Sequence, residues 1–404
     1  MPAHELVFTA GAFAALTRRL AAGDGRAEVP CALARLADRW DWLVADLSRD
    51  PAQATVLVAV RATHPEVLAE AVAVTAAEPA SGSRVVLGVG TGPAAGHLAG
   101  VVQTTRVVEP LRAVRVIAPG MPRVNLVGRT DHPAALDRER FSRTIGALGE
   151  AAFARLRSLR FAVVGCGRLG SLVADHLAGY GVAGLTLIDH DVVERHNLGE
   201  MVSVTDDAIG RLKADALAEA LRHARPAAPV TSVPVPIQSL NALFAAKEAD
   251  VIVCCPDNPE ARLVTARLAA LYLKPVLDIG TGIVRGPAGR GTGLDVRWLL
   301  PGRCVACGDT DFTTPMRGVE RLGSLRSLNT CAVGLGFTLL ERFLRGELWG
   351  SVWLQGEIGT DGVPRFTPGT RPVDRRCHIC GQAGAGDRGL SPTVAQPSRR
   401  TAAR

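Results

Sequence analysis

The sequence predicts an α/β protein whose larger part is a doubly wound, mostly parallel sheet, preceded by a smaller α/β domain. Three observations predict this fold class. Short apolar runs alternate with helical stretches, a glycine-rich turn joins one such run to a helix, and a carboxylate follows the next run. A chain of 404 residues is also too long for one ordinary core, which indicates two domains.

Residues 1–135 are expected to form the smaller domain. The strand-like runs ATVLVAV, RVVLGVG and AVRVIAP alternate there with alanine-rich helical stretches. No chemical motif accompanies them. Four histidines stand alone without an H-x-H pair, so a surface position is expected for each: His4, His64, His97 and His132. The pattern gives this domain a fold class but no role.

Residues 136–385 carry the alternation that defines the larger domain. A helical lead-in over residues 140–160 is followed by strands and helices in turn, which is typical of parallel strands joined by helical crossovers. These elements are FAVVGCG, RLGSLVADHLAGYG, GLTLIDHD, KADALAEALRHARP, ADVIVCC, PEARLVTARLAALYLKP and KPVLDIGTGI. Residues 386–404 form a basic tail with proline and serine, which is expected to be disordered.

Composition and charge argue against several classes of function. The 46 basic residues outnumber the 39 acidic ones but are spread along the chain, which favours anionic ligands over nucleic acid. No apolar run reaches the roughly 20 residues that span a bilayer. No secretory signal opens the chain, so a cytoplasmic location without membrane contact is expected. The nine cysteines are then thiols, metal ligands or core residues rather than disulfides.

The glycine-rich turn predicts a nucleotide site. Gly165, Gly167 and Gly170 follow a strand and open a helix, where they permit a tight turn, close approach to a phosphate and close helix–strand packing, respectively. The helix N-terminus offers unpaired N–H groups to an anion. Asp189 ends the next strand, where a carboxylate usually binds a ribose. These features fit a nicotinamide dinucleotide and ATP equally well.

Polar residues after Asp189 favour ATP. Asp191, Glu194 and Asn197 form a polar strip at the expected carboxyl edge of the sheet, where a dehydrogenase needs only one carboxylate. Lys213, 24 residues after Asp189, is placed to neutralise phosphate charge as pyrophosphate leaves. Solvated loop residues are the alternative for the strip, and for Glu194 alone this is the preferred interpretation. A lone lysine on a helix is usually solvated, so only the spacing of Lys213 from the other residues favours a role for it.

A second carboxylate group follows the later strand ADVIVCC. Asp257 and Asn258 come at the carboxyl end of that strand, with Arg262 shortly after. Carboxylate oxygens beside substrate phosphates are typical ligands of Mg²⁺. An Asp-Asn turn that caps the next helix is the alternative, and the two interpretations are compatible.

Together these motifs resemble the ThiF/MoeB/HesA family, bacterial relatives of ubiquitin-activating enzymes. The resemblance rests on the glycine turn, the strip DHDVVERHNL, Lys213 and DNPEAR, and it runs from about Asp137 to Cys380. It implies a Rossmann-like adenylation domain that binds Mg-ATP and adenylates the C-terminal carboxylate of a small ubiquitin-like protein or peptide.

The resemblance also implies roles for single residues. Asp189 would bind the ribose, Lys213 the phosphates and Asp257 the magnesium ion. The lead-in RFSR is similar to the segment that sends an arginine into the partner subunit's site. Arg143 is the matching position, which implies a homodimer.

Two C-x-x-C pairs predict a structural zinc site. Cys304 with Cys307, and Cys377 with Cys380, are each followed by a glycine. Four thiolates satisfy a closed tetrahedral Zn²⁺, which stabilises structure. Redox-active dithiols are the weaker alternative. Many members of the resembled family carry this two-pair site. Cys331, which lies in an apolar helical stretch, is expected in the core.

The chain also departs from the resembled family. Glu200 in NLGEM stands where members usually carry an arginine that contacts the phosphates, which puts efficient adenylation in doubt. The loop after the first cysteine pair contains no cysteine for a thioester or persulfide. The first 130 residues lack the H-x-H of a metal-dependent deubiquitinase-like domain, which some relatives carry there.

The sequence therefore predicts an ATP-dependent adenylyltransferase that acts on a ubiquitin-like, sulfur-carrier or ribosomal peptide substrate. Lys213, Asp257 and Arg143 are the expected catalytic residues. The expected cofactor-binding residues are Gly165, Gly167, Gly170, Asp189, Asp191, Asn197, Lys213, Asp257 and Asn258. A non-catalytic scaffold that binds a precursor peptide for a partner enzyme is the first alternative, and an NAD-dependent oxidoreductase is the second.

Overall fold

The computed structural model divides into two compact units. The first comprises Met1–Ala135 with Leu271–Leu273 and Gln382–Leu390, and the second comprises the remainder. The residues described are 3–45, 55–78, 83–91, 94–103, 107–126, 137–225, 228–286, 289–308, 320–323, 325–358, 363–369, 374 and 376–390.

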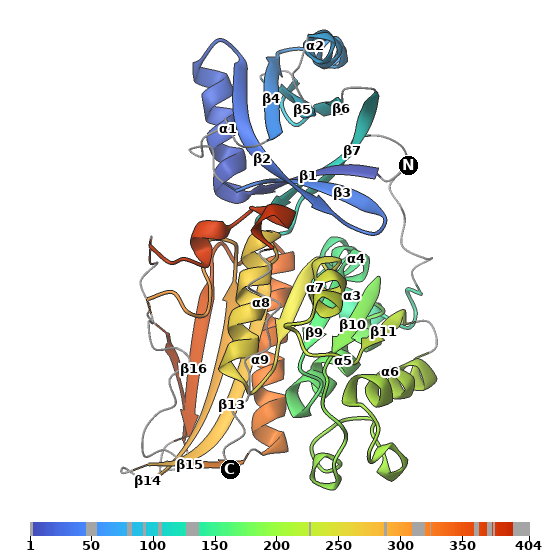
Figure 1. Cartoon of the computed structure of the whole chain (residues 1–404), viewed down its shortest axis with the longest axis vertical. Helices are drawn as coiled ribbons and strands as arrows, with labels where there is room; N and C mark the ends of the chain where they lie inside the picture. Colours follow the sequence, from blue (N-terminus) through green and yellow to red (C-terminus); the bar gives the residue numbers. More distant parts are fainter. Residues whose placement is uncertain are drawn as a thin grey trace, which may run out of the picture. The chain divides into compact units, whose positions relative to one another are not determined.

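The first unit is a mixed sheet that closes on itself (Figure 1). Its strands follow the order β1-β3-β2-β4-β5-β6-β7-β8, and β1 also pairs with β7, so two ends of the sheet meet. The expected α/β class is confirmed, but the closure joins strands from opposite ends of the unit. The elements are β1 (Ala3–Thr9), α1 (Ala10–Ala22), β2 (Arg26–Arg35), β3 (Arg39–Val44), β4 (Thr55–Ala62), α2 (Pro65–Ala77), β5 (Arg84–Gly90), β6 (Leu98–Gln103), β7 (Val108–Ile117) and β8 (Arg123–Asn125).

The surface position expected for His4 is wrong. His4 is only 2% exposed, and its Nε2 lies 2.8 Å from Glu109 Oε2. Because the indole N–H of Trp42 can only donate, it donates to His4 Nδ1, at 3.2 Å. His64 and His97 are exposed as expected, and His132 lies outside the described residues. A single-residue pattern could not show that His4 has two polar partners far along the chain, one of them buried.

A segment from near the C-terminus completes the first unit. Asp387 accepts a hydrogen bond from the Arg35 N–H at 2.9 Å and another from the Tyr272 hydroxyl at 2.7 Å. Residues Gly386–Gly389 form a 3₁₀ helix, which differs from the disorder expected from residue 386 onward. A Cβ on Gly386 would lie 2.5 Å from the Leu33 carbonyl oxygen, so only glycine fits this close approach. The tail from residue 391 lies outside the described residues.

The second unit contains the predicted doubly wound sheet. Its parallel strands lie in the order β11-β10-β9-β12-β13, so the chain winds outward in both directions from the boundary between β9 and β12. The strands are β9 (Arg160–Val164), β10 (Gly184–Ile188), β11 (Val230–Val233), β12 (Val251–Cys254) and β13 (Val276–Gly286). The helices are α3 (Ser142–Leu148), α4 (Glu150–Ser158), α5 (Arg168–Tyr180), α6 (Lys213–Ala224), α7 (Leu240–Lys247), α8 (Pro259–Leu271) and α9 (Arg326–Leu344).

Antiparallel strands extend this sheet beyond β13. The strand β14 (Gly289–Leu299) pairs with β13, β16 (Val352–Ile358) with β14, and β17 (Pro364–Pro368) with β16. A further strand, β15 (Glu320–Gly323), pairs with the other side of β13. The sequence pattern did not predict this extension.

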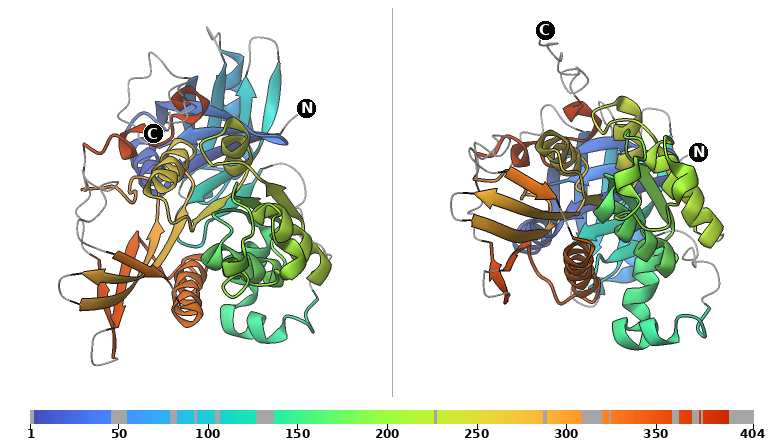
Figure 2. Two further views of the ribbon diagram at one scale, coloured as in Figure 1. Left: turned by 60° about the horizontal axis from the view of Figure 1, so that its bottom comes forward. Right: turned by 90° about the horizontal axis from the view of Figure 1, so that it is seen from below.

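Helices cover both faces of the sheet, as Figure 2 shows for α8 and α9 around β13. On one face, a Cβ at Gly336 of α9 would lie 3.0 Å from the Ile279 side chain, so glycine lets the helix approach the strand closely. On the same face, α5 contacts α9 through a hydrogen bond of 2.9 Å from the Tyr180 hydroxyl to Glu341. Among the described helices, none has the length and apolar character needed to cross a bilayer.

Candidate functional site

A cavity of about 400 Å³ lies at the carboxyl ends of the parallel strands of the second unit. In open doubly wound sheets the ligand site lies at the point where the strand order reverses, here between β9 and β12. Most of the predicted nucleotide-binding residues line this cavity: Gly165, Gly167, Asp189, Asp191, Asn197, Lys213, Asp257 and Asn258. Gly170 is not among the residues that line it.

Each glycine of the turn has a distinct geometric reason. Gly165 has φ +86°, and a Cβ there would lie 2.8 Å from the Pro256 nitrogen, in the loop after β12. A Cβ on Gly170 would lie 1.8 Å from the Gly165 carbonyl oxygen, so this glycine lets α5 pack on the turn. A Cβ on Gly167 would meet no atom within 4 Å. Gly167 therefore leaves space in the cavity wall rather than relieving a clash.

Asp189 fixes the turn from the end of β10. Its carboxylate accepts the Cys166 N–H at 2.7 Å and the Asp191 N–H at 2.9 Å. Burial raises the pKa of Asp189, and these two donors, with Lys213, offset that effect only in part. The carboxylate is thus held in place beside the turn without being fully neutralised.

The polar strip positions Lys213 at the first residue of α6. The Lys213 N–H donates to the Asp191 carbonyl at 2.8 Å, and a β-bridge joins Val192 to Leu212. The Lys213 ammonium also lies 3.0 Å from Asp191 Oδ2, and its side chain is 13% exposed. Asn197 accepts the Glu194 N–H at 2.9 Å and so caps a 3₁₀ turn at the edge of the cavity.

The loop after β12 contributes the second pair of predicted residues. Asp257 and Asn258 are exposed and line the cavity. Asn258 Oδ1 accepts the Glu260 N–H at 2.8 Å, which caps the start of α8 as the alternative interpretation proposed. Cys255 also lines the cavity, and burial raises the pKa of its thiol to about 12, so it is not a thiolate at neutral pH.

Hydrogen bonds link three side chains beside the cavity, and the sequence pattern did not predict this link. Glu200 and Thr281 both line the cavity. Asn329 of α9, fully buried, donates to Glu200 Oε2 at 3.2 Å and accepts from the Thr281 hydroxyl at 2.6 Å. The sequence flagged Glu200 as unusual but gave no sign of its partners, which lie up to 129 residues away.

A buried ion cluster lies beside the cavity on β13. Asp278 is fully buried and accepts from Arg262 and, at 2.7 Å, from Arg297. Burial opposes ionisation of Asp278, but the two guanidinium groups outweigh it and hold the pKa of this carboxyl below its usual range. Arg297 stacks in turn on the Trp353 ring, 4.6 Å from its centroid. Arg262, from the DNPEAR motif, is therefore engaged with Asp278 rather than solvated.

The four predicted zinc ligands lie together. The sulfur of Cys304 lies 3.7 Å from that of Cys307 and 3.6 Å from that of Cys377, and Cys307 lies 3.3 Å from Cys380. Four sulfurs bound at 2.3 Å to a tetrahedral zinc ion are about 3.8 Å apart, so the arrangement fits that ion. Gly308, with φ +71°, supplies the tight turn after the first pair.

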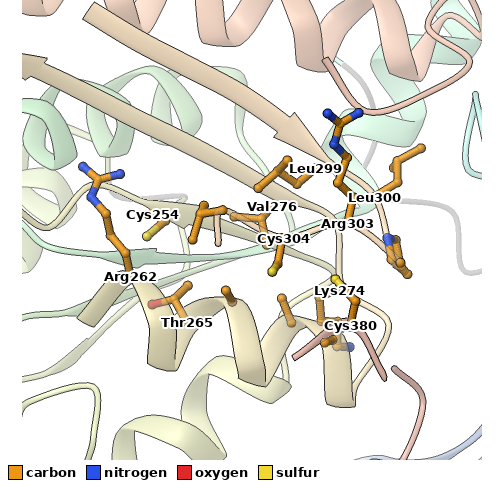
Figure 3. A pocket seen from close by; sticks show the side chains of 16 residues that line it. Cys254, Arg262, Thr265, Lys274, Val276, Leu299, Leu300, Arg303, Cys304 and Cys380 are labelled. Atoms are coloured by element: carbon orange, nitrogen blue, oxygen red, sulfur yellow. The ribbon is translucent and has the colours of Figure 1, made fainter. Parts of the chain in front are cut away.

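A much smaller pocket separates this cysteine cluster from the ion cluster. Figure 3 shows its lining, with Arg262 at one end and Cys304 and Cys380 at the other. Its volume is about 10 Å³, which is the space of roughly one water molecule. This pocket is a packing defect between α8 and the β13–β14 pair, and it offers no room for a substrate.

Two further predicted positions lie away from the cavity. Arg143 is exposed near the start of α3 and is not among the residues that line the cavity. Cys331 is exposed on α9, so the core position expected for it is wrong. It lies two residues after buried Asn329, on another side of the helix, because successive helical residues turn by about 100°.

The strand order and the glycine turn place the second unit in the class of doubly wound α/β domains with a ligand site at the switch point. Residues 141–334 match the model of the ThiF family, so this part of the second unit is a ThiF-family domain.

Several proteins of similar sequence are named as adenylyltransferases and sulfurtransferases. The "Adenylyltransferase and sulfurtransferase UBA4" of Eremothecium gossypii is 30% identical over 201 residues, which are 47% of this chain and 44% of that protein. The "Adenylyltransferase and sulfurtransferase MOCS3" of Mus musculus is 35% identical over 176 residues, 42% of this chain and 36% of that protein. The chain thus spans less than half the length of each relative.

Among solved structures, E. coli MccB with ATP is 19% identical, with a TM-score of 0.48. The match covers 62% of this chain and 76% of that one.

Proposed function

We propose that the second unit is an ATP-dependent adenylyltransferase for the C-terminal carboxylate of a ubiquitin-like protein, a sulfur carrier or a ribosomal peptide. One observation carries the proposal: a single cavity joins the glycine turn, Asp189, the Asp191–Lys213 pair and Asp257. A dehydrogenase site would not need Asp191, Lys213 or Asp257. The family match and the names of the relatives support the same reaction class.

The proposed reaction needs charge neutralisation more than a protein base. An oxygen of the substrate carboxylate attacks the α-phosphorus of ATP, the α–β phosphoanhydride bond breaks, and pyrophosphate leaves. Lys213 would neutralise charge on the phosphates, and Asp189 would accept hydrogen bonds from the ribose. Asp257 and Asn258 carry the oxygen ligands that Mg²⁺ prefers. When bound, that ion would supply charge neutralisation on the phosphates.

Arg143 would act only through a second copy of the chain. It is exposed and lies outside the cavity lining of its own chain. We therefore propose a homodimer in which each Arg143 reaches the partner's site. A cytoplasmic location, without nucleic acid or membrane partners, completes this proposal.

The test is ATP–pyrophosphate exchange with a panel of peptides that end in Gly-Gly. Lys213→Ala and Asp257→Ala should each lower the exchange rate by about 100-fold, because each removes a charge partner of the phosphates or their metal. Two exposed residues outside the cavity lining provide controls, Arg211→Ala and Asp206→Ala, and both should exchange at the wild-type rate. Unchanged exchange in Lys213→Ala would count against the assigned mechanism.

A non-catalytic scaffold is the second candidate, and Glu200 is the observation that favours it. A carboxylate in the cavity wall repels a triphosphate. A scaffold would bind precursor peptide but would support no exchange with any peptide and no measurable ATP binding. Retention of Asp189, Lys213 and Asp257 around one cavity favours the enzyme.

We also propose that the cysteine cluster holds one structural Zn²⁺. The short sulfur–sulfur distances and the burial of three of the four thiols support a closed site. Metal analysis of the wild type should find about one zinc per chain, and Cys307→Ser should lose most of it. Cys331→Ser is the matched control and should retain the metal, because this cysteine is exposed and outside the cluster. Less than half an equivalent in the wild type would reject the proposal.

A further inference from the structure

Glu200 is a carboxylate held in a fixed position by the protein interior. Its Oε2 accepts from Asn329, which is fully buried and is itself fixed by the Thr281 hydroxyl. Its backbone N–H donates to the Asn197 carbonyl at 3.0 Å. A carboxylate that is tied at both its backbone and its side chain cannot swing away from an approaching anion without losing these bonds.

The same segment lies against the first turn of α5. The Val202 N–H donates to the Ser171 hydroxyl at 3.0 Å, and Ser171 is the fourth residue of that helix. The N-terminus of α5, at Gly167 and Arg168, is where unpaired N–H groups attract phosphates. Glu200, two residues before Val202, therefore borders the end of the cavity where a phosphate tail would lie.

The charges that line the cavity are more acidic than basic. Five acidic and three basic side chains line the cavity: Asp189, Asp191, Glu194, Glu200 and Asp257 against Arg168, Lys213 and Arg262. Lys213 pairs with Asp191, and Arg262 pairs with Asp278 of the neighbouring ion cluster. Two of these three cations are thus paired with carboxylates, and the acidic side chains that line the cavity outnumber the basic ones.

We propose that Glu200 is a specificity-determining residue that makes the cavity discriminate against long phosphate tails. Repulsion grows with the number of phosphate charges, so it acts most on ATP and on pyrophosphate and least on the monophosphate of an adenylate. Glu200 thereby weakens retention of the leaving pyrophosphate relative to the adenylate. This inference rests on the proposed nucleotide site but not on the identity of the acyl substrate.

The test compares the affinities of AMP, ADP and ATP, each with Mg²⁺, for wild type and Glu200→Gln by calorimetry. The amide oxygen keeps the acceptor for Asn329, so the fold is expected to be retained. Glu200→Gln should bind ATP about tenfold more tightly, ADP by a smaller factor and AMP within twofold of wild type. Glu200→Ala should give the same order. Glu219→Gln removes an exposed carboxylate outside the cavity lining, and it should change each affinity less than twofold.

Two results would overturn the inference. If Glu200→Gln shifts all three affinities equally, Glu200 does not act through phosphate charge. If it weakens ATP binding, Glu200 instead holds a cation or a donor group of the nucleotide. Failure of all three nucleotides to bind both proteins would reject the proposed function itself, and the inference with it. Binding without discrimination rejects only the inference.

Discussion

Asp189 and Asp278 are two carboxylates at the same parallel sheet, but one borders the cavity and the other is buried between arginines. Asp278 lies inside β13, fully buried, between two arginines that hold its pKa below the usual range. Asp189 follows β10 at the cavity, where burial raises its pKa and backbone donors compensate only in part. Asp278 is paired with two guanidinium groups, whereas Asp189 borders the cavity and retains capacity for a ligand. The difference separates a position that stabilises the fold from a position available for function.

The comparison predicts its largest effect at Asp278. Asp278→Ala would leave Arg262 and Arg297 without their shared buried partner, so the free energy of unfolding should fall by about 3–5 kcal/mol. Chemical denaturation followed by circular dichroism measures this change. Glu347→Gln, which breaks an exposed ion pair with Arg345, is the control and should show no measurable change. A loss for Asp278→Ala no larger than that of the control would remove the distinction between the two carboxylates.

The glycine turn also contains one position that stabilises the fold and one position available for function. The same glycine-to-alanine substitution at each position tests this difference. Gly170→Ala would place a Cβ 1.8 Å from the Gly165 oxygen, so it should lower the free energy of unfolding by about 1–3 kcal/mol. Gly167→Ala meets no atom within 4 Å and should leave stability nearly unchanged while weakening ATP binding. Thermal melting and calorimetry measure the two effects. Equal stability of the two variants would show that Gly170 and Gly167 do not have separate roles in packing and in ligand binding.

The smallest expected effect is a pH dependence of opposite sign for the two carboxylates. The ordinary pKa of both is 3.8. The stabilisation from Asp278, whose folded-state pKa is lowered, is complete above that value and is lost as the pH falls through the folded pKa. The folded-state pKa of Asp189 is raised, so its stabilisation is present below 3.8 and is lost as the pH rises through the folded pKa.

Unfolding experiments between pH 3 and 7 with Asp278→Asn and Asp189→Asn would resolve these signs. Relative to wild type, Asp278→Asn should become less destabilised as the pH falls, and Asp189→Asn should gain stability as the pH rises. Parallel pH curves for the two variants would contradict the opposite shifts.

Local patterns in the sequence were sufficient for the parallel half of the sheet and for the turn. The G-x-G-x-x-G motif, the strip after Asp189 and the two C-x-x-C pairs are short-range signals, and the structure brings each group together. Each of these signals depends on residues that are close along the chain or on a spacing that fixes geometry.

The features that the sequence did not reveal depend on distant partners. The chain Thr281–Asn329–Glu200, the pairing of Asp278 with Arg297 and the burial of His4 all join residues from separate elements. Closure of β1 onto β7 and the addition of Gln382–Leu390 to the first unit are long-range for the same reason. Periodicity shows which face of an element is apolar, but it does not identify the partner of a polar group.

The most direct test of the central claim is a comparison of ATP and NADH binding to the 404-residue chain. Calorimetric titration with Mg²⁺ should show that ATP binds and that Lys213→Ala weakens its binding by about tenfold or more, while NADH gives no saturable signal. Tighter binding of NADH than of ATP, or an unchanged affinity for ATP in Lys213→Ala, would contradict the assignment of this cavity to ATP.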